Sequence, residues 1–204
     1  MPRTDTPRAA TQRKPWAVRH TQLLNAAELL FAERGLAAVS LEDIAHAGGV
    51  SKPIAYRHFK SRDQAYLACA HRAQADYLDV LRTITDPTAP VRDQLAASAN
   101  AFFALLEEQP ARWELVYAPP SVLPASSRDE LAALRFETIA FVHELILAAS
   151  PNAPEPLAEA FAHAISGVGE RLAHWWKTRP DVSRGQLVGM FVTVVYQGAE
   201  PFVP

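Results

Sequence analysis

The side chains best suited to chemistry in this sequence gather in one short stretch. Lys52, Tyr56, Arg57 and His58 are spaced so that a helix would present them on one face. Cationic, phenolic and imidazole groups on an exposed helix can bind phosphate oxygens and the edges of bases. These residues therefore suit the recognition of nucleic acid.

Two short helices joined by a tight turn are predicted to position that face. Ser40 can cap the first helix, with an acidic residue three positions later, and Gly48 and Gly49 supply the permissive backbone of the turn. Ser51 can cap the second helix. Residues 40–59 thus predict a helix-turn-helix whose second helix is built to enter a DNA major groove.

A preceding helix is predicted to cover the apolar side of this motif. Residues 18–34 place Leu23, Ala27 and Phe31 on one stripe, and Gly35 follows as a C-cap. Two short helices bury little surface by themselves, so this helix supplies the surface on which they pack. The result is a three-helix unit, which we assign to residues 17–66.

Length and composition predict a globular protein with a substantial core. The 204 residues are 49% hydrophobic, enough for one or two domains. The single cysteine, Cys69, excludes an internal disulfide framework and fits a reducing compartment. Residues 1–20 hold no signal-like apolar run, and the longest apolar stretch, 187–195, is far below the ~20 residues of a membrane span. We therefore expect a cytoplasmic protein that does not enter a membrane.

Charge is distributed unevenly along the chain. The net charge is -2, yet residues 1–66 hold ten Lys and Arg against six acids, so they carry +4 and the remainder carries -6. A basic end on an acidic body is expected when one end meets phosphate. Residues 1–16 have almost no apolar surface and are predicted to be a disordered basic arm, which either tracks DNA or remains a solvated tail.

The remainder of the chain is predicted to be a helical bundle. No stretch shows the period of two that a half-buried strand would have, and no repeat of solenoid length is present. Further helices are expected over residues 63–84, 91–108, 111–117, 128–149, 157–177 and 182–197. The predicted fold is all-α, with residues 67–204 forming a C-terminal helical bundle.

The run LLNAAELLFAERGLAAVSLEDIAHAGGVSKPIAYRHFKSRDQAYL resembles the N-terminal domain of the tetracycline-repressor (TetR) family of bacterial transcriptional regulators. Shared features include Ile44-Ala45, Gly49-Val50-Ser51, and Tyr56 with Phe59. The resemblance covers roughly the first third of the chain. It implies a homodimer that binds a palindromic double-stranded DNA operator, most often as a repressor, and that is released by a small molecule.

The resemblance also implies which side chains meet DNA. Tyr56 and His58 stand where family members contact phosphates, and Arg62 can meet another phosphate. Base edges would face Lys52, Pro53, Ile54 and Arg57, with Ile54 suited to a thymine methyl group. Ala55 departs from the leucine common in the family, which weakens the expected anchoring of the helix. The full candidate set is Ser40, Ser51, Lys52, Pro53, Ile54, Tyr56, Arg57, His58, Lys60 and Arg62.

No signature of catalysis or metal binding survives inspection. Gly167-Val168-Gly169 begins like a dinucleotide loop, but Leu172 replaces the third glycine and the flanks are helical. His163, Glu170 and His174 lie at i, i+7 and i+11 on one helix face. The first two are separated by two helical turns, which is too far for both to bind one metal ion without other ligands. We predict neither an enzyme, a cofactor nor a metal site. The alternative is a ligand-binding or catalytic helical protein whose helix-turn-helix does not read DNA sequence.

Two clusters in the C-terminal domain are candidates for ligand binding and dimerisation. The predicted ligand residues, which would otherwise be plain core, are Phe102, Phe103, Trp113, Tyr117, Phe136, Phe141, His143 and Trp175. The last two helices are apolar on more than one face, so they are predicted to meet a second copy of the chain. The predicted interface residues are Phe161, Ile165, Val168, Leu172, Trp176, Leu187, Phe191 and Val194.

Overall fold

The computed structural model describes residues 15–117 and 121–199, and every regular element within them is helical. The elements are α1 (Trp16–Arg34), a 3₁₀ turn (Leu36–Ala38), α2 (Leu41–Ala47), α3 (Lys52–His58), α4 (Arg62–Ile84), α5 (Val91–Glu108), α6 (Pro110–Tyr117), α7 (Ala125–Ala149), α8 (Glu155–Trp176) and α9 (Arg184–Ala199). The predicted all-α class is confirmed.

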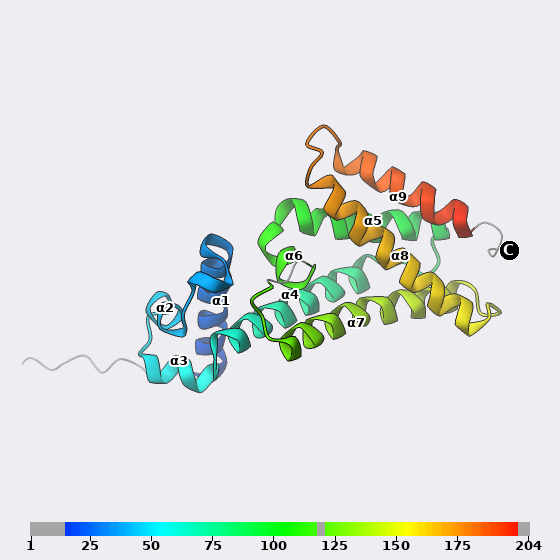
Figure 1. Cartoon of the computed structure of the whole chain (residues 1–204). Helices are drawn as coiled ribbons and strands as arrows, with labels where there is room; N and C mark the ends of the chain where they lie inside the picture. The colour runs from blue at the N-terminus through cyan, green and yellow to red at the C-terminus, as the bar shows by residue number, and fades with distance from the viewer. Residues whose placement is uncertain (1–14, 118–120, 200–204) are drawn as a thin grey trace, which may run out of the picture.

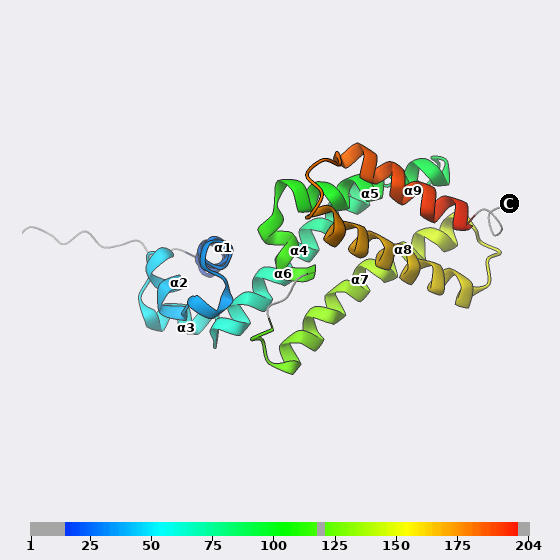
Figure 2. The ribbon, with the colours of Figure 1, turned by 45° about the horizontal axis from the view of Figure 1, so that its top comes forward.

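The helices divide into a small unit and a larger body joined by α4. Helices α1, α2 and α3 pack together at one end, and α4 runs from them into the body (Figure 1). There α5 lies along α9 and α7 lies along α8, with α6 between α4 and α5 (Figure 2). The buried apolar side chains form one connected cluster from α1 through α4 to α9. The two parts therefore share a continuous core.

Three helices begin two or three residues earlier than the sequence periodicity predicted. Helix α1 begins at Trp16, α7 at Ala125 and α8 at Glu155, each directly after a proline. Proline has a fixed φ near the helical value and lacks an N–H, and both properties are tolerated at a helix start. The predicted disordered arm thus overlaps α1 at Trp16, while its residues 1–14 lie outside the described part of the chain.

The single cysteine is a structural core residue. Cys69 on α4 is fully buried, and its thiol donates a weak hydrogen bond to the carbonyl oxygen of Leu24 on α1 at 3.8 Å. Burial disfavours the thiolate and raises the pKa of Cys69 to about 12. The thiol therefore holds α4 against α1 and is poorly suited to reaction.

Some apolar residues of α8 and α9 that were predicted to contact a second copy of the chain are instead buried within this one. Leu187 and Phe191 are buried inside the protomer against α5, so their assignment to a dimer interface is wrong. Val194 is 58% exposed, as is consistent with an uncovered face. Phe161, Ile165, Val168, Leu172 and Trp176 are half-buried. None of the described helices has the length and apolar character needed to cross a membrane.

Candidate nucleic-acid interface and ligand pocket

The first helix of the motif is capped as the sequence predicted. The Ser40 hydroxyl oxygen accepts a hydrogen bond from the backbone N–H of Asp43 at 3.1 Å, and the Asp43 carboxylate accepts one from the backbone N–H of Ser40 at 2.8 Å. The hydrogen bond from the Ser40 side chain is the largest cause of the lowered pKa of Asp43. This reciprocal cap fixes where α2 begins.

The turn between α2 and α3 requires both of its glycines. Gly49 has a φ of +61°, in the left-handed region that favours glycine. Gly48 lies so close to α1 that a Cβ atom there would be 2.7 Å from a methyl carbon of the fully buried Leu23. The carbonyl oxygen of Gly48 also accepts a 2.7 Å hydrogen bond from the side chain of Gln22. The turn is thus clamped onto α1.

Helix α3 is anchored by its apolar side and presents its polar side to solvent. Ala55 and Phe59 are buried, whereas Lys52, Tyr56 and Arg57 are exposed. The predicted amphipathic arrangement is therefore present for these residues, whereas His58, which was also predicted on the exposed face, is half-buried against Trp16. Ser51 occupies the cap position, although its side chain accepts no capping hydrogen bond.

Residues predicted to meet DNA come together from two separate segments. Ser40, Tyr56, Lys60 and Arg62 line one open hollow on the surface of the DNA-binding unit. Arg62 donates a hydrogen bond to the carboxylate of Asp63 at 3.1 Å. The hollow combines two cations and three hydroxyl groups, which suit a phosphate, with the carboxylates of Asp43 and Asp63, with which a phosphate would have to compete.

Glu42 of α2 binds two of the side chains that were predicted to meet DNA. No contact of Glu42 with these side chains was predicted from the sequence. Its carboxylate forms an ion pair with Lys52 and accepts a 3.4 Å hydrogen bond from the Tyr56 hydroxyl. The hydrogen bond from Lys52 is the largest cause of the lowered pKa of Glu42. The Lys52 ammonium also lies 5.6 Å from the centre of the Tyr56 ring. Binding of Lys52 to a base edge and of Tyr56 to a phosphate must therefore compete with Glu42.

An aromatic cluster joins the start of α1 to the end of α3. The ring of Trp16 stacks on His58 with 3.7 Å between centroids, and the Arg57 guanidinium lies 5.9 Å from the centre of the Trp16 ring. The Nδ1 atoms of His20 and His58 are 3.3 Å apart. Burial lowers the pKa of both histidines. His58 is thus half-buried in a cluster, a role that its spacing on the helix did not reveal.

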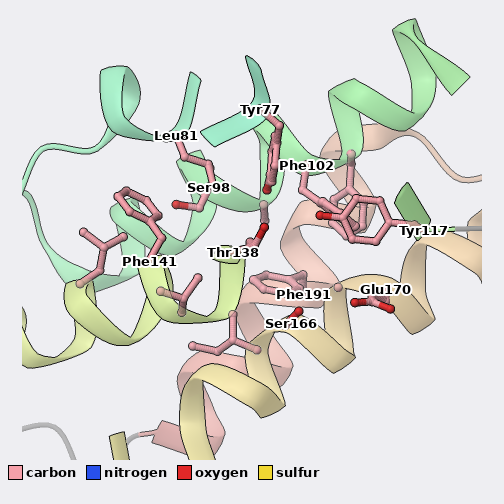
Figure 3. Close-up of a pocket in the computed structure, with 16 residues that line it drawn as sticks. Tyr77, Leu81, Ser98, Phe102, Tyr117, Thr138, Phe141, Ser166, Glu170 and Phe191 are labelled. Carbon is pink, nitrogen blue, oxygen red and sulfur yellow. The ribbon is translucent and has the colours of Figure 1, made fainter. Parts of the chain in front are cut away.

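The body contains a partly open cavity of about 60 Å³ among α4, α5, α7, α8 and α9, with the end of α6 beside it (Figure 3). Four predicted ligand residues line it, namely Phe102, Phe103, Tyr117 and Phe141. Residues that the sequence analysis did not place in a ligand site also contribute, notably Tyr77, Thr138 and Glu170. The sequence offered little indication of their place, because a single polar residue on a long helix could equally lie on an exposed face.

The other four predicted ligand residues lie outside this cavity. Trp113 is fully buried behind it and stacks on Tyr117 with 5.3 Å between ring centroids. Phe136 is 56% exposed and contacts His163 instead. His143 is half-buried with an unpaired Nε2 atom, and Trp175 faces outward beneath the guanidinium of Arg179. Helix rotation decides these positions, since each helix turns only one part of its aromatic set toward the cavity.

A network of charges connects the DNA-binding unit to the body. Arg72 of α4 binds the Glu28 carboxylate of α1 at 2.7 Å and donates to the Asn25 side-chain oxygen at 2.7 Å. Arg112 of α6 lies 3.7 Å from the same Glu28 carboxylate and forms an ion pair with Asp76 of α4. The network therefore ties α1, α4 and α6 to one another.

The DNA-binding unit matches a known family of regulators. Residues 23–69 fit the family described as bacterial regulatory proteins, tetR family. This segment of the chain is therefore similar to the TetR family. This match confirms the resemblance stated from the sequence, and it covers the helix-turn-helix together with most of α1 and the start of α4.

Known proteins extend the similarity beyond this TetR-family domain. The chain is 35% identical over 105 residues to the HTH-type transcriptional activator FasR of Mycolicibacterium smegmatis, which is 52% of this chain and 48% of that protein. It is 32% identical over 100 residues to the HTH-type transcriptional repressor KstR2 of the same organism, 47% of each. The chain thus spans about half the length of these curated relatives.

The fold of the whole described chain is also found in a solved TetR-like structure. A TetR-like transcriptional regulator from Rhodococcus sp. RHA1 superposes with a TM-score of 0.70 over 92% of this chain and 99% of the other. The sequence identity between the two is 23%, so the match concerns the fold. The helical body after α4 is therefore arranged as in a TetR-like regulator.

Proposed function

We propose that this protein is a homodimeric, sequence-specific DNA-binding transcriptional regulator without catalytic activity. The observation that carries the proposal is the exposed face of α3, where Lys52, Tyr56 and Arg57 project from a helix anchored by a buried apolar side. Such a helix fits the major groove, and the neighbouring hollow with Lys60 and Arg62 suits the flanking phosphates. The operator is a palindrome read by two copies of α3.

The proposed effector is a small apolar or aromatic molecule that enters the cavity of the body and lowers affinity for DNA. Helix α6 connects the two sites, since Tyr117 lines the cavity and Arg112 contacts Glu28 of α1. The Tyr66 hydroxyl of α4 also donates a 3.2 Å hydrogen bond to the carbonyl oxygen of Leu115 on α6. A ligand that prefers one position of α6 and α4 therefore shifts α1 and the recognition helices.

Repression is the direction of control that we propose. One relative is named an activator and the other a repressor, so DNA binding is the part of the function that both names share. A reporter gene placed behind the selected operator measures the direction. Falling expression when the protein is present supports repression, and rising expression assigns activation.

The DNA-binding proposal is tested by selecting bound sequences from random duplexes. The wild-type protein should enrich a palindrome, whereas Arg57→Ala should lose discrimination at one base position by about 1–3 kcal/mol. Tyr56→Phe should weaken binding to all sequences alike, because a phosphate contact carries no base preference. Arg92→Ala changes an exposed arginine of the body and serves as the control. The proposal is rejected if the wild-type protein enriches no sequence.

A further inference from the structure

The described residues of the cavity wall include one negatively charged side chain and no positively charged one. None of the described residues that line it is Lys, Arg or His, and Glu170 of α8 is its one charged group. The Glu170 carboxylate is half-buried and forms no hydrogen bond or ion pair with a described residue. A carboxylate placed in this way is available to a ligand.

Hydroxyl groups form a polar end of the cavity beside Glu170. Tyr117 is 6% exposed, and its hydroxyl makes no hydrogen bond of good geometry with a described residue. Burial raises the pKa of Tyr117, and a looser polar contact with the Thr138 side chain acts in the opposite direction. In Figure 3 this hydroxyl points toward those of Tyr77 and Thr138. The Thr138 oxygen accepts a 2.6 Å hydrogen bond from the Gln74 side chain. A buried polar atom without a partner is costly, so a ligand group that pairs with Tyr117 gains affinity.

The opposite end of the cavity is mostly apolar and able to widen, although the Ser98 hydroxyl of α5 lies there beside Leu81 and Phe141 (Figure 3). It is formed by Leu81 of α4, by Phe141, Val142 and Leu145 of α7, and by Ile165 of α8. The residues from α7 and α8 are only half-buried, so their side chains have space into which they can move. The present volume of about 60 Å³ is small, so a ligand with an extended apolar part requires these side chains to move.

We infer that the effector is a small apolar molecule whose polar end donates hydrogen bonds and is positively charged or neutral, such as an amine or an alcohol. This inference rests on the proposed function, because it names the class of ligand for the proposed effector cavity. The ammonium or hydroxyl group lies between Glu170 and Tyr117, and the apolar part extends toward Phe141.

A carboxylate ligand is disfavoured by the same geometry. Its charge would be removed from water, placed near the like charge of Glu170, and left without a cation among the lining residues. Burial is the main influence on the pKa of Tyr117 and raises it, whereas the charge of Arg135 on α7 lowers it. Arg135 does not line the cavity. Donor groups avoid this penalty, since they supply what the Glu170 and Tyr117 oxygens can accept.

Three probes with one apolar part and different polar ends test this inference. Phenylbutylamine, phenylbutanol and phenylbutanoate share a phenylbutyl group and end in an ammonium, a hydroxyl and a carboxylate. Their binding to the full chain is measured by titration calorimetry near pH 7.5. We expect the amine to bind at least tenfold more tightly than the acid, with the alcohol between them. Glu170→Gln should reduce the ratio between amine and acid at least threefold.

Two further variants distinguish the site from a general charge effect. Tyr117→Phe should weaken the amine and the alcohol severalfold, while Glu144→Gln, an exposed carboxylate of α7 outside the cavity, should leave all three affinities unchanged. Glu170→Gln preserves the shape of the side chain, and circular dichroism confirms that the variant folds. The inference is overturned if the acid binds as tightly as the amine, if Glu170→Gln leaves the ratio unchanged, or if no probe binds.

The same preparations separate this inference from the proposed function. DNA binding is measured without any probe on the selected operator. Loss of the expected ranking with intact operator binding rejects the ligand class alone. The expected ranking in a protein that selects no DNA sequence supports the ligand class and rejects the regulator function.

Discussion

Glu42 is bound to two side chains that the sequence predicts to contact DNA, so it limits their freedom to do so. Because it holds both Lys52 and Tyr56 in the free protein, its carboxylate acts as a competitor of the DNA phosphates. We expect Glu42→Gln to bind the operator severalfold more tightly and with a steeper dependence on salt, because Lys52 is no longer paired. Binding is measured by fluorescence anisotropy at several salt concentrations.

The control for this prediction removes an equal charge elsewhere. Glu33 is an exposed carboxylate at the end of α1, so Glu33→Gln changes the net charge by the same amount without touching α3. If the two variants gain affinity equally, the effect is one of net charge and Glu42 has no specific role.

The paired histidines should make the stability of the DNA-binding unit depend on pH. Their ordinary pKa is 6.5, and burial lowers the folded-state pKa of both His20 and His58. The unfolded chain therefore takes up protons first as the pH falls. The free energy of unfolding should be fully retained above about pH 6.5 and should decrease as the pH drops from there toward the folded-state pKa values.

Chemical denaturation between pH 7.5 and 5 checks this prediction. His58→Gln should flatten the decline, because it removes one of the two groups and the repulsion that would arise when both rings are charged. The control is His46→Gln, at an exposed histidine of α2. An equally steep decline in His58→Gln would show that other groups cause the acid sensitivity.

At the scale of elements, the ion pairs of α1 with α4 and α6 share one carboxylate, that of Glu28. Glu28 and Arg72 have side chains only 18% and 22% exposed, so breaking their pair leaves a poorly hydrated charge. We expect Arg72→Gln to lower the free energy of unfolding by about 1–3 kcal/mol. In urea denaturation the exposed pair of Arg82 with Asp79 gives the comparison, since Arg82→Gln should change stability little.

The same network predicts how the two parts of the molecule communicate. Removing Arg112 separates α6 from Glu28 without altering the cavity wall or α3. If α6 is the connection proposed above, operator affinity in Arg112→Gln should persist while its response to a bound probe declines. An unchanged response would leave α4 as the main connection.

At the scale of the whole molecule, the uncovered face of α8 and α9 is the surface we propose for the second copy. Met190 and Val194 are exposed on α9, and Gly167 and Gly189 have open space where a Cβ atom would lie. Small residues on an uncovered apolar face allow helices of two copies to approach closely. This surface replaces the one predicted with Leu187 and Phe191.

Val194→Glu should convert the dimer to a monomer and weaken operator binding, because it places an unpaired charge in the proposed interface. Sedimentation velocity measures the state of assembly. Val122→Glu introduces the same charge at a valine that is 53% exposed and distant from both helices in the sequence. A Val194→Glu protein that remains dimeric would place the interface on another surface.

The sequence alone determined the features that depend on neighbouring residues. The Ser40 cap, the glycine turn and the exposed face of α3 follow from hydrogen bonds and spacings within a few residues, and the structure shows them. His58 is the exception on α3, because its stacking on Trp16 is a contact with a distant part of the chain. The resemblance to the TetR family rested on the same local pattern, because the spacing of its motif is set by the turn and the two helices. Interactions between neighbouring residues were therefore sufficient to predict the helix-turn-helix.

Only the tertiary structure decided which apolar face each long helix turns toward which neighbour. Phe141 and Tyr117 line the cavity whereas Phe136 and Trp175 do not, and Phe191 is covered by α5 instead of a second copy. Helical periodicity shows which residues share a face, but it does not show what covers that face. That depends on contacts between helices far apart in the sequence, such as α5 with α9. The same contacts bring Glu170 and Tyr117 to one cavity.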